Sequence, residues 1–568
     1  MSKNRQYLPL DFRISDWASL EPYYKALLDF NIQTTADFEQ FLKQLSELES
    51  MVSEDLAWRY IKMTCDTSNP ELEQAYVDFV NLIQPNIAPY EDLLNKKINQ
   101  CPFLKDLNQT ADYRIYFRAI QNAIALYREE NVPLQAELQT LSQKYGSITG
   151  AMSVVFNGET LTLQQAANFL KSTDRTIRQS AYETIQACRY DKREELNQLF
   201  DQLIALRHKV ALNAGFDNFR DYMHQAMGRF DYSVEDCFSF HNAIEKVVVP
   251  LCKQLEAERL KTLGYEVLKP YDLSVDAQQR EPLKPFTTGK ELLEKTIQCF
   301  DQLDHGFAEN LTLMGQKGFL DLESRLGKAP GGYNYPLAES GIPFIFMNAA
   351  GSLRDVETMV HEGGHAMHSF LSEHLSLNAF KNAPMEVAEV ASMSMELMSM
   401  QAWDAFFDDA NDLKRAKIEQ LEGVIATLPW IATIDAYQHW LYTHPKHSQQ
   451  ERTEAWLSIT KRFDTGVCDY SGYEHYLANA WQKQLHLYEV PFYYIEYGFA
   501  QLGAIAVWRN VLADKAKGIQ AYKDMLALGY TKTIPELYAA ANMKFDFSEA
   551  YVGELFGFVW KELQALKA

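Results

Sequence analysis

Apolar residues recur at spacings of three and four positions over most of this chain. The pattern is clear in residues 37–48 and 71–98, and it returns over 176–265 and from 355 to the C-terminus. Such spacing places the apolar side chains on one face of an α-helix. The 568 residues include only 26 Gly and 19 Pro, so residues that favour hairpin turns are scarce. The sequence therefore predicts a mostly α-helical protein rather than a β-sandwich or barrel.

One β-hairpin is expected in the N-terminal half. Residues 153–162 are rich in β-forming residues, and Asn157-Gly158 stands at their centre. Asn-Gly is the strongest short hairpin signal, because both residues accept the positive φ angles of a tight turn. Thr162 followed by Gln165 resembles a capping box, which predicts that a helix begins directly after the hairpin.

A second β segment and an irregular connection are also expected. Residues 266–290 contain three prolines and few apolar runs, which predicts a stretch without regular structure. Residues 343–347 read Pro-Phe-Ile-Phe-Met, an apolar run that predicts a strand.

Charge and cysteine usage limit the compartment and the partners. Acidic residues outnumber basic ones 76 to 54, giving a net charge of −22, whereas a nucleic-acid footprint needs a basic face. The N-terminus shows no apolar leader, and no stretch is long enough to span a membrane. We expect a cytoplasmic protein with no nucleic-acid or membrane partner. Its seven cysteines are scattered and never form CxxC, which indicates reduced thiols rather than disulfides or a thiolate zinc site. They are Cys65, Cys101, Cys188, Cys237, Cys252, Cys299 and Cys468.

The strongest functional signal is the run His361-Glu362-Gly363-Gly364-His365. On a helix, two histidines four positions apart lie on one face and can bind one Zn²⁺ at about 2.0–2.1 Å each. Glu362 then stands beside the metal as a general base for its bound water. The alternative is a solvated helix face with two ordinary histidines.

The two glycines favour the functional reading. Gly363 and Gly364 lie in the middle of a helical pattern, where each costs about 1 kcal/mol relative to Ala. A purely structural helix gains nothing from this pair. A helix whose backbone must be approached closely by another strand or by a substrate does gain from it.

A catalytic zinc usually has three protein ligands and one open position, so a third ligand must come from elsewhere. The metzincin pattern requires a histidine six residues after the second histidine of the motif. Here that position holds Leu371, so the metzincin class is excluded. Glu373 lies too far along the same helix. The remaining downstream candidates belong to a second helix that begins after Pro384. They are Glu386, Glu389 and Glu396.

Two of these glutamates share a face of an otherwise apolar helix. Glu389 and Glu396 are seven positions apart, and burial of such carboxylates is costly without a cation or hydrogen bonds. We take Glu389 as the third ligand and Glu396 as a carboxylate that orients a ligand histidine. A salt bridge on the helix face is the alternative for Glu396, and Glu386 is the next candidate for the ligand.

These residues resemble a known family. The run HEGGHAMHSF at 361–370, Ala-Glu-Val-Ala-Ser at 388–392 and Glu396 resemble the oligoendopeptidase F and thimet oligopeptidase family of zinc metallopeptidases, and within it the Pz-peptidase-like group. Residues 154–178 and 331–346 are also similar to this family. The resemblance extends from about residue 110 to the C-terminus.

The resemblance implies both a fold and a site. The fold would be mostly α, an elongated two-lobed helical metallopeptidase that encloses a deep channel, with a small β-sheet next to the HExxH helix. The channel would restrict substrates to unstructured oligopeptides. The implied zinc ligands are His361, His365 and Glu389, with one Zn²⁺ per chain, and the implied base is Glu362. Cobalt or manganese suit the same ligands.

The resemblance also implies a C-terminal His and Tyr pair near the scissile carbonyl. The matching segment contains His486, Tyr494 and Tyr497, and the two tyrosines are three apart, a spacing that shares a helix face. Without the resemblance, such an aromatic run reads more simply as core. The glycine-rich loop of the thimet oligopeptidase branch is absent between His486 and Tyr494.

The sequence thus predicts a zinc-dependent endopeptidase. It would hydrolyse internal bonds of short unstructured oligopeptides with a metal-activated water and Glu362. An exopeptidase and a helical scaffold that sequesters peptides are the alternatives, and the oligomeric state stays open. The predicted regions are an N-terminal helical region at 1–110, an oligoendopeptidase F-like region with the hairpin at 111–190, and the zinc peptidase catalytic region at 191–568.

Overall fold

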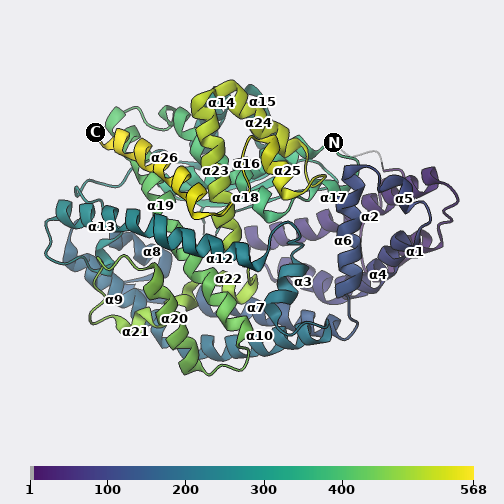
Figure 1. The fold of residues 1–568 in the computed structure, drawn as a ribbon, viewed down its shortest axis with the longest axis horizontal. Helices are drawn as coiled ribbons and strands as arrows, with labels where there is room; N and C mark the ends of the chain where they lie inside the picture. The colour runs from purple at the N-terminus through teal and green to yellow at the C-terminus, as the bar shows by residue number, and fades with distance from the viewer. Residues whose placement is uncertain (1–4, 326, 330) are drawn as a thin grey trace. The chain divides into compact units, whose positions relative to one another are not determined.

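The computed structural model describes residues 5–325, 327–329 and 331–568 and is predominantly α-helical, as predicted (Figure 1). The residues gather into two compact units. Unit 1 comprises the chain up to Glu129, Lys284–Lys417 and Ala500–Phe545, and unit 2 comprises Glu130–Leu283, Ile418–Phe499 and Asp546–Ala568. Each unit is built from three separate stretches of chain. The predicted regions 1–110, 111–190 and 191–568 follow the chain along its length and stay a prediction.

The elements of unit 1 are α1 (Trp17–Asp29), α2 (Thr35–Cys65), α3 (Pro70–Asp78), the π-helical turn η1 (Phe79–Ile83), α4 (Gln84–Gln100), α5 (Leu104–Leu107), α6 (Ala111–Leu126), α14 (Gly289–Leu303), α15 (His305–Lys317), β3 (Leu320–Glu323), β4 (Tyr333–Tyr335), β5 (Phe344–Ala349), α16 (Leu353–Ser372), α17 (Asn378–Lys381), α18 (Met385–Ser399), the 3-10 helix η5 (Met400–Ala405), α24 (Lys515–Ala527) and α25 (Ile534–Ala540).

The elements of unit 2 are α7 (Asn131–Gly150), β1 (Ser153–Phe156), β2 (Glu159–Thr162), α8 (Leu163–Ala167), the 3-10 helix η2 (Asn168–Lys171), α9 (Arg175–Asp191), α10 (Arg193–Asn213), α11 (Phe219–Ala226), α12 (Val234–Ala243), the π-helical turn η3 (Ile244–Val248), α13 (Val249–Leu263), the 3-10 turn η4 (Pro270–Asp272), α20 (Gln449–Phe463), α21 (Glu474–Leu477), the 3-10 helix η6 (Ala480–Lys483), α22 (Leu485–Glu489) and α26 (Glu549–Lys567). Two helices contribute residues to both units, α19 (Ala410–Thr443) and α23 (Ile495–Ala513).

The N-terminal helices form because their apolar faces meet. A capping box of Thr34 and Asp37 begins α2, and Phe38, Phe41 and Leu45 on its inner face are buried. They pack in one core with residues of α1, α4 and α6, the purple to blue helices of Figure 1. The helical pattern predicted at 37–48 and 71–98 is confirmed, with the second stretch divided among α3, η1 and α4.

A small sheet lies beside α16, as the resemblance implies, and it has three strands. The order is β3-β5-β4, with β3 parallel and β4 antiparallel to β5. The central strand β5 is the apolar run predicted at 343–347, and its first four residues are buried. It packs against α16. Neither edge strand was expected, because β4 has three residues and the Leu-Asp-Leu-Glu of β3 is too short and polar to distinguish from a helix end.

The glycine pair of α16 serves close packing. A Cβ added at Gly364 would lie 2.6 Å from the carbonyl oxygen of Ala391 and from Cα of Ser392, both in α18. A Cβ at Gly363 would lie 2.6 Å from the ring of Phe300 in α14. The glycines therefore let a neighbouring helix backbone and an aromatic ring contact α16. The expectation of a close approach is confirmed, with a helix in place of the strand or substrate that we considered.

The predicted hairpin is confirmed in unit 2. β1 and β2 pair antiparallel, and Asn157 and Gly158 have φ of 52° and 84°, as a type I′ turn requires. Thr162 and Gln165 form the expected capping box of α8. That helix is shorter than expected, because Leu170 lies in the 3-10 helix η2.

The stretch at 266–290 is irregular as predicted, with η4 as its only turn of helix before Gly289 begins α14. Among the described helices, none combines the length and the hydropathy that crossing a membrane requires.

Candidate metal centre

His361 and His365 lie one turn apart on α16. Their rings are 4.9 Å apart between centroids and nearly perpendicular, with an angle of 84°. The imidazole side chains are 21% and 18% exposed, so they are half-buried but not closed off from solvent. Two ring nitrogens can therefore face a common point, as the spacing of the motif predicts.

Glu389 of α18 completes a group of three donors. Its Oε2 lies 3.4 Å from Nε2 of His361 and 3.6 Å from Nε2 of His365. The three donor atoms lie within 4.8 Å of one another. The hydroxyl of Ser392, one turn further along α18, donates to Glu389 Oε2 at 3.1 Å. This bond holds the carboxylate toward the two imidazoles.

Glu396 contacts the other side of His361. Its Oε1 lies 2.6 Å from Nδ1 of His361. In the tautomer that carries a proton on Nδ1, this nitrogen donates to Glu396 and leaves Nε2 with a lone pair toward Glu389. This arrangement is the one in which an outer carboxylate orients a metal-ligand histidine.

The two other glutamate candidates lie elsewhere. Glu386 is buried on α18 but does not belong to the three-donor group. Glu373 was expected on the same helix as the histidines; the structure ends α16 at Ser372, and Glu373 is its C-cap. There it accepts a hydrogen bond at 2.8 Å from Nζ of Lys381.

Glu362 is buried beside the two histidines and next to the chain that leads into β4. A Cβ on Gly332 would lie 3.7 Å from Oε1 of Glu362, and Asn334 Nδ2 donates to the Glu362 carbonyl at 3.3 Å. Burial, with help from the charges of Glu389 and Glu396, raises the pKa of Glu362 to about 7 despite the opposing effect of His361. A carboxyl group with such a pKa can accept and release a proton near neutral pH.

The two motif histidines differ electrostatically. Burial lowers the pKa of His365 to about 4, so its imidazole is neutral at pH 7. Burial also acts on His361, but hydrogen bonds with Glu389 and Glu396 outweigh it and raise the pKa of His361 well above its ordinary value. A bound cation would take the place of that proton.

The donor set fits a divalent transition metal. Two imidazoles and one carboxylate are a common ligand set of catalytic zinc, in which the fourth position stays open. Burial of a carboxylate is costly without a cation or hydrogen bonds; Glu389 is buried, Glu396 is half-buried, and both contact His361. His368, one turn beyond His365, is buried with its pKa lowered to about 4 by burial, and it does not join the donor group.

His486, Tyr494 and Tyr497 come together in unit 2. The His486 ring, in α22, lies 4.7 Å from the Tyr494 ring and 5.8 Å from the Tyr497 ring, and the two tyrosine rings are 5.6 Å apart. Tyr494 lies in the turn before α23, whereas Tyr497 lies in its first turn, so the shared helix face that we expected is wrong. The contact between them arises from the turn instead.

A buried ion pair fixes the start of α23. Arg229 donates to Glu496 Oε1 at 2.8 Å and also to the carbonyl of Phe492. Both charged side chains are buried. The segment that carries the three aromatic residues is thereby attached to the chain after α11.

Sequence reasoning missed two supporting residues. Ser392 stands three positions after Glu389, and this spacing on a helix could have suggested the hydrogen bond to the carboxylate. Asn334 gave no signal, because its approach to Glu362 depends on the pairing of β4 with β5.

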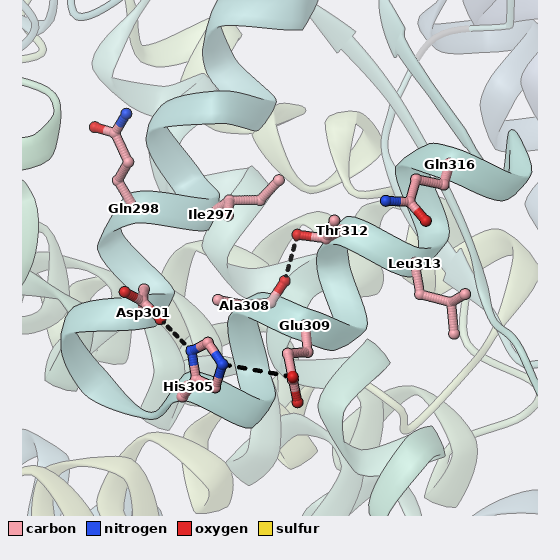
Figure 2. A pocket seen from close by; sticks show the side chains of 9 residues that line it. All are labelled: Ile297, Gln298, Asp301, His305, Ala308, Glu309, Thr312, Leu313 and Gln316. Carbon is pink, nitrogen blue, oxygen red and sulfur yellow. Dashed lines mark hydrogen bonds and ion pairs between the residues drawn. The ribbon is translucent and has the colours of Figure 1, made fainter.

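A surface hollow in unit 1 contains none of the candidate metal ligands. It lies between α14 and α15, and Figure 2 shows His305 between Asp301 and Glu309 at its edge. The His305 nitrogens lie 2.7 Å and 3.4 Å from these two carboxylates, and all three side chains are strongly exposed. Exposed pairs of this kind contribute little free energy.

Two family models match this chain. The model of peptidase family M3 matches residues 168–555, and that of the peptidase M3 N-terminal domain matches residues 8–127. An oligoendopeptidase F homologue from Borreliella burgdorferi is 21% identical over 535 residues, 90% of this chain and 87% of the relative.

Solved structures share the fold over nearly the whole chain. PZ peptidase A with an inhibitor has a TM-score of 0.92 at 25% identity, covering 98% of this chain and 99% of that one. Oligoendopeptidase F from Enterococcus faecium has a TM-score of 0.65 at 15% identity, covering 97% of both chains. The family match includes α16, α18 and the segment from His486 to Tyr497. The chain therefore belongs to peptidase family M3, and it hydrolyses peptide bonds.

Proposed function

We propose that this peptidase is a zinc-dependent endopeptidase that cleaves internal bonds of short, unstructured oligopeptides in the cytoplasm. One observation carries the proposal: the donor atoms of His361, His365 and Glu389 converge within 4.8 Å, and Glu362 is the residue next to the first of them. The names of the relatives support the substrate class, because several are oligoendopeptidases.

His361, His365 and Glu389 would hold the zinc. When bound, the cation supplies a Lewis acid that lowers the pKa of a coordinated water toward about 7 and polarises a substrate carbonyl. Glu396 keeps His361 in the tautomer whose Nε2 is a ligand, through the 2.6 Å contact at Nδ1. Ser392 holds Glu389 through its hydroxyl.

Glu362 moves the proton. Its carboxylate takes a proton from the attacking water and delivers it to the nitrogen of the leaving amine. The pKa of about 7 in the protein without metal, caused by burial, means that the group is poised for both steps. A nearby cation would lower this pKa and favour the carboxylate that begins the cycle.

His486, Tyr494 and Tyr497 are proposed to stabilise the negative charge that develops on the carbonyl oxygen. This role rests on the resemblance to the family. A preorganised hydroxyl or imidazole donor at such a position contributes about 3–4 kcal/mol to the transition state. Their mutual ring contacts would hold the donors in a fixed orientation.

The endopeptidase is tested with a mixed pool of oligopeptides, analysed by mass spectrometry before and after incubation. Internal cuts that are absent with Glu362→Gln are the expected result. Release of terminal dipeptides or single residues alone would establish an exopeptidase instead. Binding of the pool without cleavage, in protein that carries its zinc, would favour a peptide-sequestering scaffold and overturn the proposal.

A further inference from the structure

A second group of metal-binding side chains lies in unit 2. α12 carries Cys237 and His241 one turn apart, and α19 carries Asp435 and His439 one turn apart. All four are buried, and the most exposed of them, His439, is only 6% exposed. In the described part of the chain, Cys237, Asp435 and His439 form one of two groups whose donor atoms lie within 4.8 Å of one another.

Asp435 is the centre of the group. Its Oδ2 lies 2.8 Å from Nε2 of His241 and 3.1 Å from Nε2 of His439. Donor atoms around a tetrahedral zinc are separated by about 3.3–3.8 Å, given bond lengths of about 2.0–2.3 Å. The donor atoms of Cys237, Asp435 and His439 lie within 4.8 Å of one another, so modest side-chain rotations are enough to direct these three at one ion.

Three polar atoms in this group lack a hydrogen-bond partner. They are Oδ1 of Asp435 and both ring nitrogens of His439, all of them buried. The 3.1 Å approach between His439 and Asp435 does not have hydrogen-bond geometry. An unpaired buried donor or acceptor costs about 1–3 kcal/mol, so three together in one place require an explanation. A cation bound by Asp435 Oδ1 and one His439 nitrogen would satisfy two of them.

The surroundings of the group are aromatic. The ring of His439 lies 4.9 Å from that of Phe238 and 5.4 Å from that of Phe492, and Phe463 lies 6.5 Å from His241. Apolar walls of this kind strengthen the attraction between a cation and its ligands. The four side chains of the group are at most 6% exposed, so the group lies inside unit 2 and not on its surface.

His241 contacts the carboxylate of Asp435 from its other side. Its Nε2 lies 2.8 Å from Oδ2 of Asp435, so Oδ1 is left available to a metal ion.

We propose that Cys237 Sγ, Asp435 Oδ1 and a ring nitrogen of His439 bind a second divalent transition-metal ion, with zinc as the best match to a thiolate, imidazole and carboxylate set. His241 holds Asp435 in position from its other oxygen. Without metal, the Cys237 thiol donates a hydrogen bond to the carbonyl of Ser233. When the metal binds, the thiol loses this proton to solvent and becomes a thiolate. The ion joins α12 to α19, and the chain then carries two metals rather than one.

The absorption spectrum of bound Co²⁺ can distinguish this site from the proposed catalytic site in unit 1. The candidate ligands of unit 1 are two imidazoles and a carboxylate, so Co²⁺ bound there cannot give a thiolate-to-cobalt charge-transfer absorption in the near ultraviolet. The full chain is stripped of metal, reconstituted with Co²⁺ and analysed for its near-ultraviolet spectrum and its bound cobalt. We expect two cobalt ions per chain and a charge-transfer band.

Two variants locate the thiolate. Cys237→Ser should lose the band and one of the two cobalt ions. Cys252→Ser is the matched control, because Cys252 is also a buried thiol of unit 2 and donates to a backbone carbonyl, that of Ile425; this variant should keep both. Glu389→Ala should lose the other cobalt and keep the band, which separates this site from the proposed catalytic zinc.

The proposal is overturned if wild-type protein binds a single cobalt and shows no charge-transfer band. It is also overturned if the band survives Cys237→Ser. If Cys237→Ser fails to fold, the wild-type spectrum and stoichiometry still decide, with His439→Asn as the second variant: loss of one cobalt there supports the site, and retention of both contradicts it.

Discussion

The glutamates around the candidate metal centre on α16 and α18 differ in what they contact. Glu389 contacts both motif histidines, whereas Glu396 contacts only His361 and does so through the other ring nitrogen. The two glutamates, seven residues apart, thus contact different nitrogens of His361, which matches the ligand role proposed for Glu389 and the orienting role proposed for Glu396. Glu362 differs from both, because its burial and raised pKa suit proton transfer.

Replacing Glu389 tests the third ligand. Glu389→Ala should weaken zinc binding by more than the roughly 10–100-fold that loss of an outer carboxylate costs, because a ligand itself is removed. Zinc affinity is measured by competition with a chromogenic chelator. Glu386→Ala is the control, since Glu386 lies on the same helix outside the donor group. Unchanged affinity in Glu389→Ala with a loss in Glu386→Ala would transfer the ligand role to Glu386.

Replacing Tyr497 tests the proposed oxyanion donor. Tyr497→Phe should lower kcat by about 10²–10³-fold with little change in KM, because the lost hydrogen bond is made chiefly in the transition state. Tyr493→Phe serves as the control, since the Tyr493 ring lies 5.3 Å from that of Tyr497 in the same cluster. A change confined to KM would assign Tyr497 to substrate binding instead.

At the scale of the elements, the distance between α16 and α18 is what brings Glu389 to the histidines. Gly364 permits that distance, because any Cβ there would meet the backbone of α18. This contact explains Gly364, and the ring of Phe300 explains Gly363, so both helix-weakening residues between the histidines have a packing reason. The candidate metal centre thus depends on backbone packing as well as on its proposed ligands.

Gly364→Ala should destabilise the protein by about 1–3 kcal/mol, because α18 must move to relieve the overlap, and it should weaken zinc binding as Glu389 moves with its helix. Thermal unfolding and metal titration measure the two effects. The control is Gly557→Ala in α26, where an added Cβ meets no atom within 4 Å. This variant should be neutral or stabilised by up to about 1 kcal/mol. Equal effects of the two variants would refute the packing explanation.

The elements themselves were partly predictable. The hairpin with Asn157-Gly158 and the strand β5 follow from local patterns, a turn signal in one and a continuous apolar run in the other. The edge strands β3 and β4 did not, because their structure comes from pairing with β5 and not from their own residues. The turn that holds Tyr494 was also missed; the carbonyl of Phe492 in it accepts a hydrogen bond from the sequence-distant Arg229.

At the scale of the whole molecule, sequence reasoning predicted the helical class and the facing of α16 and α18. It could not predict that each compact unit is assembled from three separate stretches, because contacts between distant stretches leave no periodic signal. The group around Asp435 was missed in the same way. Cys237 lies nearly two hundred positions from Asp435, so no motif spacing connects them.

An ion-pair network around Asp272 should make the free energy of unfolding depend on pH in the acidic range. Asp272 of η4 accepts hydrogen bonds at 2.8 Å from Arg178 and 2.7 Å from Arg175 of α9. Burial would raise the pKa of Asp272, but these two arginines hold it below its ordinary value of 3.8. The stabilisation is complete above that value and is lost as the pH falls below it toward the folded-state pKa.

Asp272→Asn should therefore lower Tm at neutral pH, by the equivalent of about 3 kcal/mol, because it leaves the buried Arg178 without its charge partner. The difference in Tm between the variant and the wild type should become smaller as the pH falls below 3.8, the ordinary pKa of an aspartate. Glu549→Gln, which breaks the exposed pair with Lys246, should leave Tm nearly unchanged at every pH. A difference in Tm between Asp272→Asn and the wild type that is constant with pH would contradict the role given to the Asp272 carboxylate.

The most direct test of the whole account measures kcat and bound zinc in the same preparation of Glu362→Gln. The substitution keeps the size of the side chain but removes its ability to accept a proton. We predict that zinc content stays at the wild-type level while kcat for an internal peptide bond falls by about 10²–10⁴-fold. Near-normal turnover in protein that retains its zinc would contradict the account, because Glu362 would then not be the base.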